Sequence, residues 1–109
     1  KVRSADATLM QQETFGPVGA FLAYHDEEQA LAWVNASPFG LAASVWTHDL
    51  SQALRYSERI SAGTVWVNMH TLLDPALPFG GVKGSGNGRE FGSAFIADYT
   101  RLKSVMMRY

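Results

Sequence analysis

The stretch from Ser61 to Gly92 constrains this chain more than any other part of it. It starts with an apolar run, Thr64 to Val67, that predicts a buried strand, and it ends in a segment, Gly80 to Gly92, that holds six of the ten glycines. Glycine loses more conformational entropy on folding than any other residue. A cluster of this density therefore indicates positive φ angles or a close approach of two backbone segments.

Apolar runs alternate with helical patterns over the first two thirds of the chain. The predicted strands lie at 18–24, 41–46 and 64–67, and the predicted helices at 26–36 and 50–60. Asp26 has the residue type and position of an N-cap, and acidic residues follow it in the first turn. The order β-α-β-α-β is typical of an α/β fold with parallel strands.

The pattern changes after Asn68. Met69 to Leu77 is predicted to be an irregular apolar loop, followed by the glycine-rich turn, a short helix around 89–96 and a final strand at 99–109. Three strands and a tail make a poor independent sheet. This favours a piece of a larger protein or one member of a tight oligomer, and the start at Lys1 rather than Met predicts truncation, processing or incomplete ordering.

Composition excludes several classes of function. The net charge is −1 without a long run of one sign, so we expect neither nucleic acid nor an anionic membrane as partner. The sequence has no membrane-spanning apolar run and no apolar signal core near Lys1, which fits a cytoplasmic location. With no cysteine, and with His25, His48 and His70 more than 20 residues apart, we expect no metal site and interpret the histidines as surface or satisfied residues.

Two blocks of sequence carry a family resemblance. They are Glu13-Thr14-Phe15-Gly16-Pro17-Val18 and Pro78-Phe79-Gly80-Gly81-Val82-Lys83-Gly84-Ser85-Gly86-Asn87-Gly88-Arg89-Glu90. In this order and spacing they closely resemble the C-terminal part of the NAD(P)-dependent aldehyde dehydrogenases, from about Gln12 to Tyr109. The resemblance implies that residues 1–98 are the C-terminal part of the catalytic domain and that 99–109 form an oligomerisation strand.

The same resemblance implies four site residues. Glu13 would bind the ribose on the nicotinamide side of NAD or NADP, with Phe15 beside the nicotinamide, and Leu73 and Phe79 would line the aldehyde tunnel. On residue types alone, Glu13 is an ordinary surface acid in a Gly-Pro turn, and the apolar loop simply covers a sheet edge. Gln12 stands where the family usually has a second acid. The residues from Gly84 to Arg89 do not match G-x-G-x-x-G, so we interpret them as a structural turn rather than a phosphate loop.

The function implied is oxidation of an aldehyde to a carboxylic acid by a cysteine thiolate, with NAD or NADP as electron carrier. Since the chain has no cysteine, it contains no catalytic residue and is expected to be inactive alone. The loop offers no Trp or Tyr to receive a cation, which favours a hydrophobic aldehyde, and the run from Val67 to Asp74 is similar to that of phenylacetaldehyde dehydrogenases.

Two other functions remain open at this point. The chain could be a non-catalytic truncated paralogue that serves as an assembly module, or an unrelated α/β ligand-binding domain that shares the motifs. The expected partners are a small aldehyde and further copies of the protein, joined through the C-terminal strand as a dimer or a larger oligomer.

Overall fold

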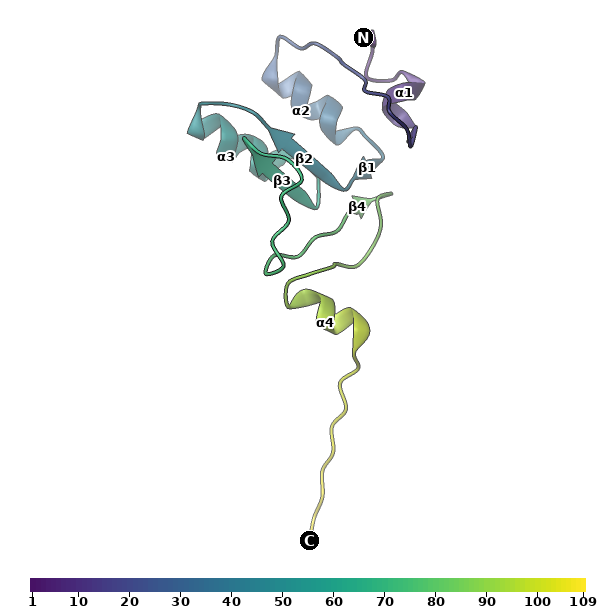
Figure 1. Cartoon of the computed structure of the whole chain (residues 1–109), viewed down its shortest axis with the longest axis vertical. Helices are drawn as coiled ribbons and strands as arrows, with labels where there is room; N and C mark the ends of the chain where they lie inside the picture. Colours follow the sequence, from purple (N-terminus) through teal and green to yellow (C-terminus); the bar gives the residue numbers. More distant parts are fainter.

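A computed structural model describes residues 1–109, apart from the side chain of Ala94. Its eight elements form a small mixed α/β structure that ends in an extended C-terminal tail (Figure 1). In chain order they are α1 (Thr8–Gln11), α2 (Glu27–Asn35), β1 (Phe39–Gly40), β2 (Ala42–Val45), α3 (Leu50–Arg59), β3 (Thr64–Val67), β4 (Val82–Lys83) and α4 (Ala94–Tyr99).

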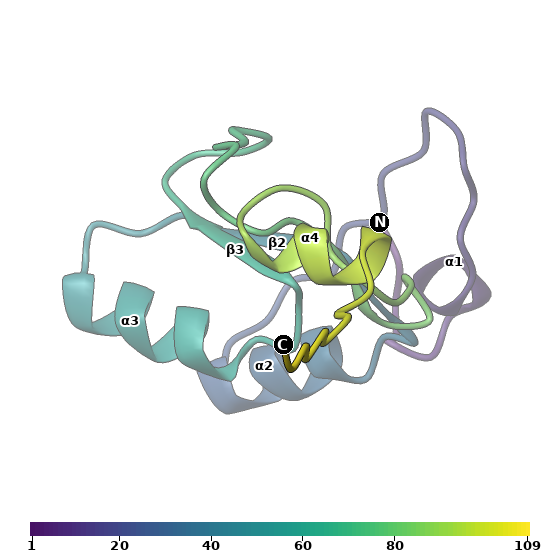
Figure 2. The same ribbon diagram turned by 90° about the horizontal axis from the view of Figure 1, so that it is seen from below.

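A parallel pair of strands, β2 and β3, forms the centre of the fold. The register pairs Ala42 with Thr64 and continues to Val45 with Val67. Helix α3 connects the two strands and packs on both of them, and α2 lies beside α3 on the same side of the sheet (Figure 2). The predicted α/β class and the parallel pairing are confirmed.

Both long helices begin where a side chain caps them. The carboxylate of Asp26 accepts a hydrogen bond from the backbone N–H of Glu28, and that of Asp49 accepts from Ser51 and Gln52. Such caps satisfy N–H groups that have no partner inside the helix. The predicted helix at 26–36 and its N-cap are therefore confirmed, as is the helix predicted at 50–60.

Two ion pairs join the exposed sides of α2 and α3. Arg55 lies 2.7 Å from Glu27, and Arg59 donates to both carboxylate oxygens of Glu28. The hydrogen bond from each arginine holds the pKa of its glutamate partner below the usual range. Because both pairs are exposed to solvent, they fix the relative position of the helices more than they add to stability.

The core of this chain is small for its length. The buried hydrophobic residues in the described part of the structure are Ala5, Ala30, Leu31, Ala53, Tyr56 and Trp66. Many large apolar side chains are exposed, and the radius of gyration is 18.4 Å, against about 13 Å for a compact domain of this size. Exposed apolar surface on this scale is typical of a face that another polypeptide covers.

The strand predicted at 18–24 is not formed. Among the described residues, this segment makes one backbone hydrogen bond to a distant segment. In it, the Phe21 carbonyl accepts from the N–H of Val2. Val18, Phe21 and Tyr24 are exposed. Apolar periodicity alone cannot make a strand, because a strand also needs a neighbour to complete its ladder of hydrogen bonds.

The end of the chain also differs from prediction. The helix predicted around 89–96 starts only at Ala94 and includes Tyr99, because Glu90 pairs with Phe79, and Phe91 and Gly92 have φ of 60° and 58°. A left-handed backbone cannot continue a right-handed helix. In the rest of the strand predicted at 99–109, the Thr100 hydroxyl donates to the carbonyl of Ile96. The described residues after Thr100 pair with no other strand and extend away from the body (Figure 1).

The glycine-rich segment folds back on an element that the sequence did not predict. β4 pairs antiparallel with β1, with Phe39 opposite Lys83 and Gly40 opposite Val82. A Cβ on Gly63 would lie 1.6 Å from the carbonyl oxygen of Gly80, so the two segments cross where only glycine fits. The close backbone approach predicted from the glycine cluster is confirmed.

Two asparagine side chains form hydrogen bonds with backbone groups just beyond the ends of strands and helices. Asn68, directly after β3, accepts from the N–H of Thr47 at 2.9 Å and donates to its carbonyl at 2.8 Å. Asn35, at the end of α2, donates to the Arg59 carbonyl and accepts from the N–H of Ser61, both at 2.8 Å. Each amide therefore replaces a pair of backbone hydrogen bonds where regular structure stops.

We expect Asn68→Ala to destabilise the fold by about 1–3 kcal/mol, because two hydrogen bonds of about 0.5–1.5 kcal/mol each are lost. Alanine also tolerates poorly the φ of 54° at this position. Asn68→Asp should also destabilise the fold, since its carboxylate still accepts from the N–H of Thr47 but places a second acceptor oxygen against the Thr47 carbonyl. Urea unfolding followed by circular dichroism measures both effects. The control is Asn87→Ala at an exposed site, and an equal loss in the two alanine variants would contradict the role of Asn68.

Candidate functional site

The loop between β3 and β4 encloses an apolar pocket of about 260 Å³. Leu73 and Phe79, predicted from the sequence as neighbours in a site, both line it. The rest of the lining comes from β3, the loop and the turn before Phe79: Thr64, Val65, Trp66, Met69, Leu72, Asp74, Leu77 and Pro78. Apart from Asp74 and Thr64 the side chains are apolar, so the pocket suits a hydrophobic group.

One residue of the pocket lining, Phe79, takes part in a short antiparallel contact. Phe79 and Glu90 exchange two backbone hydrogen bonds of 2.7 Å. Before it, the carboxylate of Asp74 accepts from the N–H of Ala76 at 2.8 Å, which forms the turn that leads to Pro78. The Phe79 ring is therefore held by backbone pairing, whereas Leu73 lies on the more open part of the loop.

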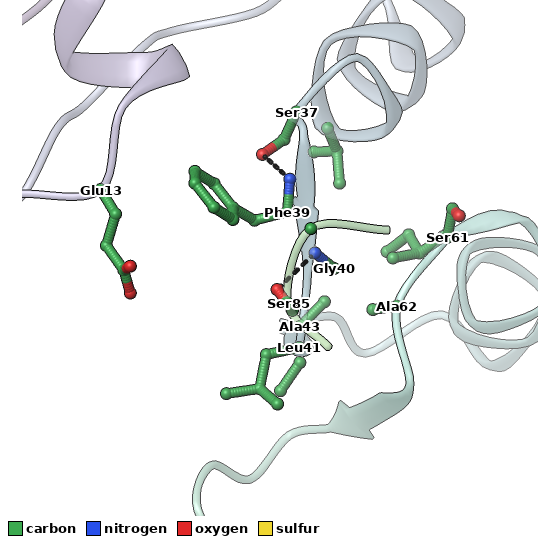
Figure 3. A pocket seen from close by; sticks show the side chains of 13 residues that line it. Glu13, Ser37, Phe39, Gly40, Leu41, Ala43, Ser61, Ala62 and Ser85 are labelled. Carbon is green, nitrogen blue, oxygen red and sulfur yellow. Dashed lines mark hydrogen bonds between the residues drawn. The ribbon is translucent and has the colours of Figure 1, made fainter. Parts of the chain in front are cut away.

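Glu13 lines a different and larger pocket, of about 490 Å³. Figure 3 shows Glu13 on a separate segment from the residues around Phe39 and Gly40. The opposite wall is fixed by hydroxyl groups, since Ser85 accepts from the N–H of Gly40 at 2.9 Å and Ser37 from that of Phe39 at 3.2 Å. In the part of the chain that the structure describes, the carboxylate of Glu13 has neither a hydrogen bond nor an ion pair.

Phe15 lies two residues further along the same segment and is 93% exposed. Its φ of 48° is unusual for an aromatic residue and turns the chain sharply before Pro17. The structure thus brings Leu73 and Phe79 together in one pocket, but it does not bring Glu13 and Phe15 to them. The physical reason is that the segment carrying Glu13 and Phe15 belongs to no sheet that would fix its place.

The glycine-rich turn is a structural turn, as the sequence predicted. Gly86 and Gly88 have φ of 125° and 79°. Arg89 donates to the carbonyls of Gly81 and Gly88, at 2.8 and 2.7 Å, and Asp98 accepts from the N–H of Arg89. These polar groups bind one another, which leaves the arginine engaged inside the turn.

Tyr99 and Glu90 form the other polar contact near this turn. The hydroxyl of Tyr99 donates to the carboxylate of Glu90 at 3.3 Å. The negative charge of Glu90 raises the pKa of the Tyr99 phenol, and the hydrogen bond adds to this effect. At neutral pH the phenol therefore stays protonated and serves as a donor.

Sequence reasoning missed a cluster that shares Trp66 with the apolar pocket. Ser44 Oγ and His70 Nδ1 are 2.7 Å apart, and the rings of His70 and Trp66 meet edge to face with 5.4 Å between centroids. Nothing in the spacing of these residues indicates the contact, because Ser44 lies on the other strand of the pair. Among the described residues, no group of acidic, histidine or cysteine side chains could hold a metal ion. Nor is any described helix long and apolar enough to cross a bilayer.

Comparison with known protein families gives a match over almost the whole chain. The profile described as "Aldehyde dehydrogenase family" matches residues 2–105. The phenylacetaldehyde dehydrogenase of Pseudomonas fluorescens is 49% identical over 104 residues, which are 95% of this chain and 21% of that protein. The betaine aldehyde dehydrogenase of Cereibacter sphaeroides is 51% identical over 98 residues, or 90% of this chain and 20% of that protein.

Solved structures agree with the sequence matches. An aldehyde dehydrogenase of Bacillus cereus in complex with NAD+ superposes with a TM-score of 0.89 at 42% identity, covering 94% of this chain and 21% of the other. One from Mycobacterium tuberculosis, also complexed with NAD+, gives 0.84 at 44% identity, with 93% and 21% covered. The chain thus spans about a fifth of the length of the relatives it matches.

Proposed function

This chain belongs to the aldehyde dehydrogenase family, and we propose that it forms the cofactor-ribose contact and part of the substrate tunnel of an enzyme that oxidises a hydrophobic aldehyde with NAD or NADP. The observation that carries the proposal is the continuous match over residues 2–105 together with an apolar pocket lined by both Leu73 and Phe79. These 109 residues are then one part of a longer enzyme.

The residues at the proposed cofactor contact fit a dinucleotide. The carboxylate of Glu13 faces an open pocket without a partner in the described structure, so both oxygens are free to accept hydrogen bonds from ribose hydroxyls. The exposed ring of Phe15 offers a flat apolar surface to a planar ring. NAD(P), when bound, supplies the hydride acceptor. In this proposal the role of Glu13 and Phe15 is to orient that acceptor. Solved relatives contain NAD+, which supports use of this cofactor by the complete enzyme.

The nucleophile of the reaction must come from outside these residues. Family members attack the aldehyde with a cysteine thiolate, and this sequence has no cysteine. The part of the reaction assigned to this chain is therefore positioning. Leu73 and Phe79 bury the aldehyde's apolar group, and Glu13 and Phe15 hold the hydride acceptor.

Changing Glu13 tests the cofactor contact. In the complete enzyme, Glu13→Gln should slow hydride transfer up to about 100-fold, because a small displacement of reacting groups is costly. Single-turnover formation of NAD(P)H measures this step. Glu58→Gln, an equal change at an exposed site on α3, should leave the rate unchanged. Equal rates of hydride transfer in both variants would contradict the assignment.

The isolated 109-residue chain should form no NAD(P)H from an aldehyde and NAD(P), because it has no cysteine. Absorbance of NAD(P)H above that of a buffer control would contradict this expectation.

The lining of the pocket predicts the preferred aldehyde. We expect a higher kcat/KM for phenylacetaldehyde than for betaine aldehyde, since an aromatic ring gains about 25 cal/mol per Å² on burial against apolar side chains. The loop from Met69 to Leu77 offers the trimethylammonium cation no Phe, Tyr or Trp ring. The aromatic side chains that line the pocket are Trp66 and Phe79, and the other lining residues give a cation no aromatic face to contact. Relatives named for each substrate match this chain, so steady-state kinetics with both aldehydes is the deciding measurement.

A matched pair of leucine variants separates the pocket from general stability. Leu73→Ala should lower kcat/KM for phenylacetaldehyde about tenfold, which corresponds to the loss of about 1.4 kcal/mol of contact. Leu54→Ala on the exposed side of α3 should have no effect on substrate preference. A preference for betaine aldehyde in the unchanged enzyme would refute the pocket argument.

We further propose that the terminal segment, residues 99–109, assembles copies of the enzyme. In the described structure its residues after Thr100 pair with no other strand, and its apolar side chains are exposed, from Val105 at 67% to Leu102 at 105% and Tyr109 at 118%. Unpaired extended backbone with alternating apolar residues readily adds to the sheet of another chain.

Deletion of Leu102 to Tyr109 should therefore reduce the oligomer to smaller species, because the backbone donors and apolar side chains of the added strand are lost. Light scattering coupled to size exclusion gives the mass. Glu58→Gln, at an exposed site on α3 outside the segment, is the control and should keep the assembly. An unchanged mass after the deletion would exclude this segment as the assembly element.

A further inference from the structure

Three side chains from separate parts of the fold meet at Trp66, which also lines the apolar pocket. Ser44 comes from β2, Trp66 from β3 and His70 from the loop that follows β3. His70 contacts both of the others, through Nδ1 at 2.7 Å from Ser44 Oγ and through its ring, which lies edge to face on Trp66 at 74°. The parallel pairing of the strands is what brings them together, since Ser44 and Trp66 are opposite one another in the register.

The same tryptophan connects this cluster to the pocket. The indole Nε1 of Trp66 donates a hydrogen bond of 2.8 Å to the carbonyl oxygen of Leu72, and Trp66, Leu72 and Leu73 all line the pocket. Trp66 is buried and its strand is paired, so its position is set by the sheet. Any contact that fixes the loop against Trp66 therefore also fixes Leu72 and Leu73.

The loop after β3 is held against the sheet by side-chain contacts rather than by backbone pairing. Within the described structure, residues 69–73 make no backbone–backbone hydrogen bond, although Asn68 before them and Leu77 after them do. Asn68 and Thr71 have positive φ of 54° and 58°, which make the loop turn twice within four residues. A loop without backbone pairing depends on side-chain contacts for its conformation.

A hydrogen-bonded serine and histidine also match the nucleophile and the base of a catalytic triad, whose third member is a group that orients the base. Here the third member is missing among the described residues, because no carboxylate bonds to His70. The edge contact with Trp66 instead indicates that the His70 ring holds the loop against β3.

We propose that His70 is a positioning residue that holds the substrate-facing loop through Ser44 and Trp66, and thereby sets the size of aldehyde that the pocket prefers. The identity of the substrate in this inference rests on the proposed function. The contacts of His70 with Ser44 and Trp66 are independent of that function. His70 acts through Leu72 and Leu73 and touches no reacting atom.

Four variants of the complete enzyme test this role. Ser44→Ala removes the hydrogen bond from the strand side, His70→Leu removes both contacts, and the double variant Ser44→Ala/His70→Leu removes them together. His70→Asn keeps an amide able to bond Ser44. His48→Leu, at an exposed position before α3, is the matched control.

Kinetics with phenylacetaldehyde and with acetaldehyde gives the first readout. We expect His70→Leu to raise KM for phenylacetaldehyde about three- to tenfold with kcat nearly constant, and to leave acetaldehyde kinetics unchanged, because only the larger aldehyde reaches the displaced loop. The double variant should be no worse than His70→Leu, since one contact is not lost twice. His70→Asn should recover part of the preference. Equal effects on both aldehydes, or additive effects of the two single changes, would overturn the inference.

Hydrogen exchange of the peptide covering 68–77 gives a readout that needs no activity. The hydrogen-bonded amides of this peptide are those of Asn68, Ala76 and Leu77. Their exchange should be faster in Ser44→Ala and His70→Leu than in the unchanged enzyme and His48→Leu. Unaltered exchange in both variants would overturn the positioning role, whatever the kinetics. An unchanged enzyme that oxidises no aldehyde would instead refute the proposed function, and the exchange data would still decide whether His70 holds the loop.

Discussion

The parallel pairing of β2 with β3 is the constraint on which the rest of the structure depends. It sets Ser44 opposite Trp66 and places the ends of both strands side by side, where Asn68 bonds to Thr47. The apolar pocket is lined by β3 and the loop that follows it. His70 lies on that loop and contacts a residue of each strand, Ser44 and Trp66. Because a parallel pair needs a crossover, α3 is also fixed against the sheet by the same contact.

Close passage of two backbone segments adds a second constraint. Gly63 at the start of β3 lies against Gly80, and any side chain at Gly63 would occupy the space of the Gly80 carbonyl. This crossing brings the glycine-rich segment back across the sheet, so that β4 can pair with β1 and Phe79 can enter the pocket. The glycines therefore serve packing, and the positive φ angles of Gly86 and Gly88 serve the turn that follows.

The surface of the chain is consistent with a part of a larger assembly. Few side chains are buried, whereas Phe15, Val18, Phe21 and Tyr24, and the apolar residues from Leu102 to Tyr109, are exposed. An isolated polypeptide gains little from such a surface, because the free energy of burying it is realised only against another face. The two segments whose predicted strands are absent are the same two that carry this exposed apolar surface.

The sequence by itself determined the local features. The cap at Asp26, the two long helices and the apolar strands at β2 and β3 depend on neighbouring residues, and each was predicted from residue type and spacing. The glycine cluster predicted a close backbone approach, but not that Gly63 is the partner of Gly80. The family also followed from sequence, because its motifs are long and their order is specific. Tertiary structure alone decided the β1–β4 pair, the failure of 18–24 to form a strand and the contact of Ser44 with His70. These depend on which distant segments meet, and hydrogen bonds between strands are satisfied by partners that local sequence does not specify.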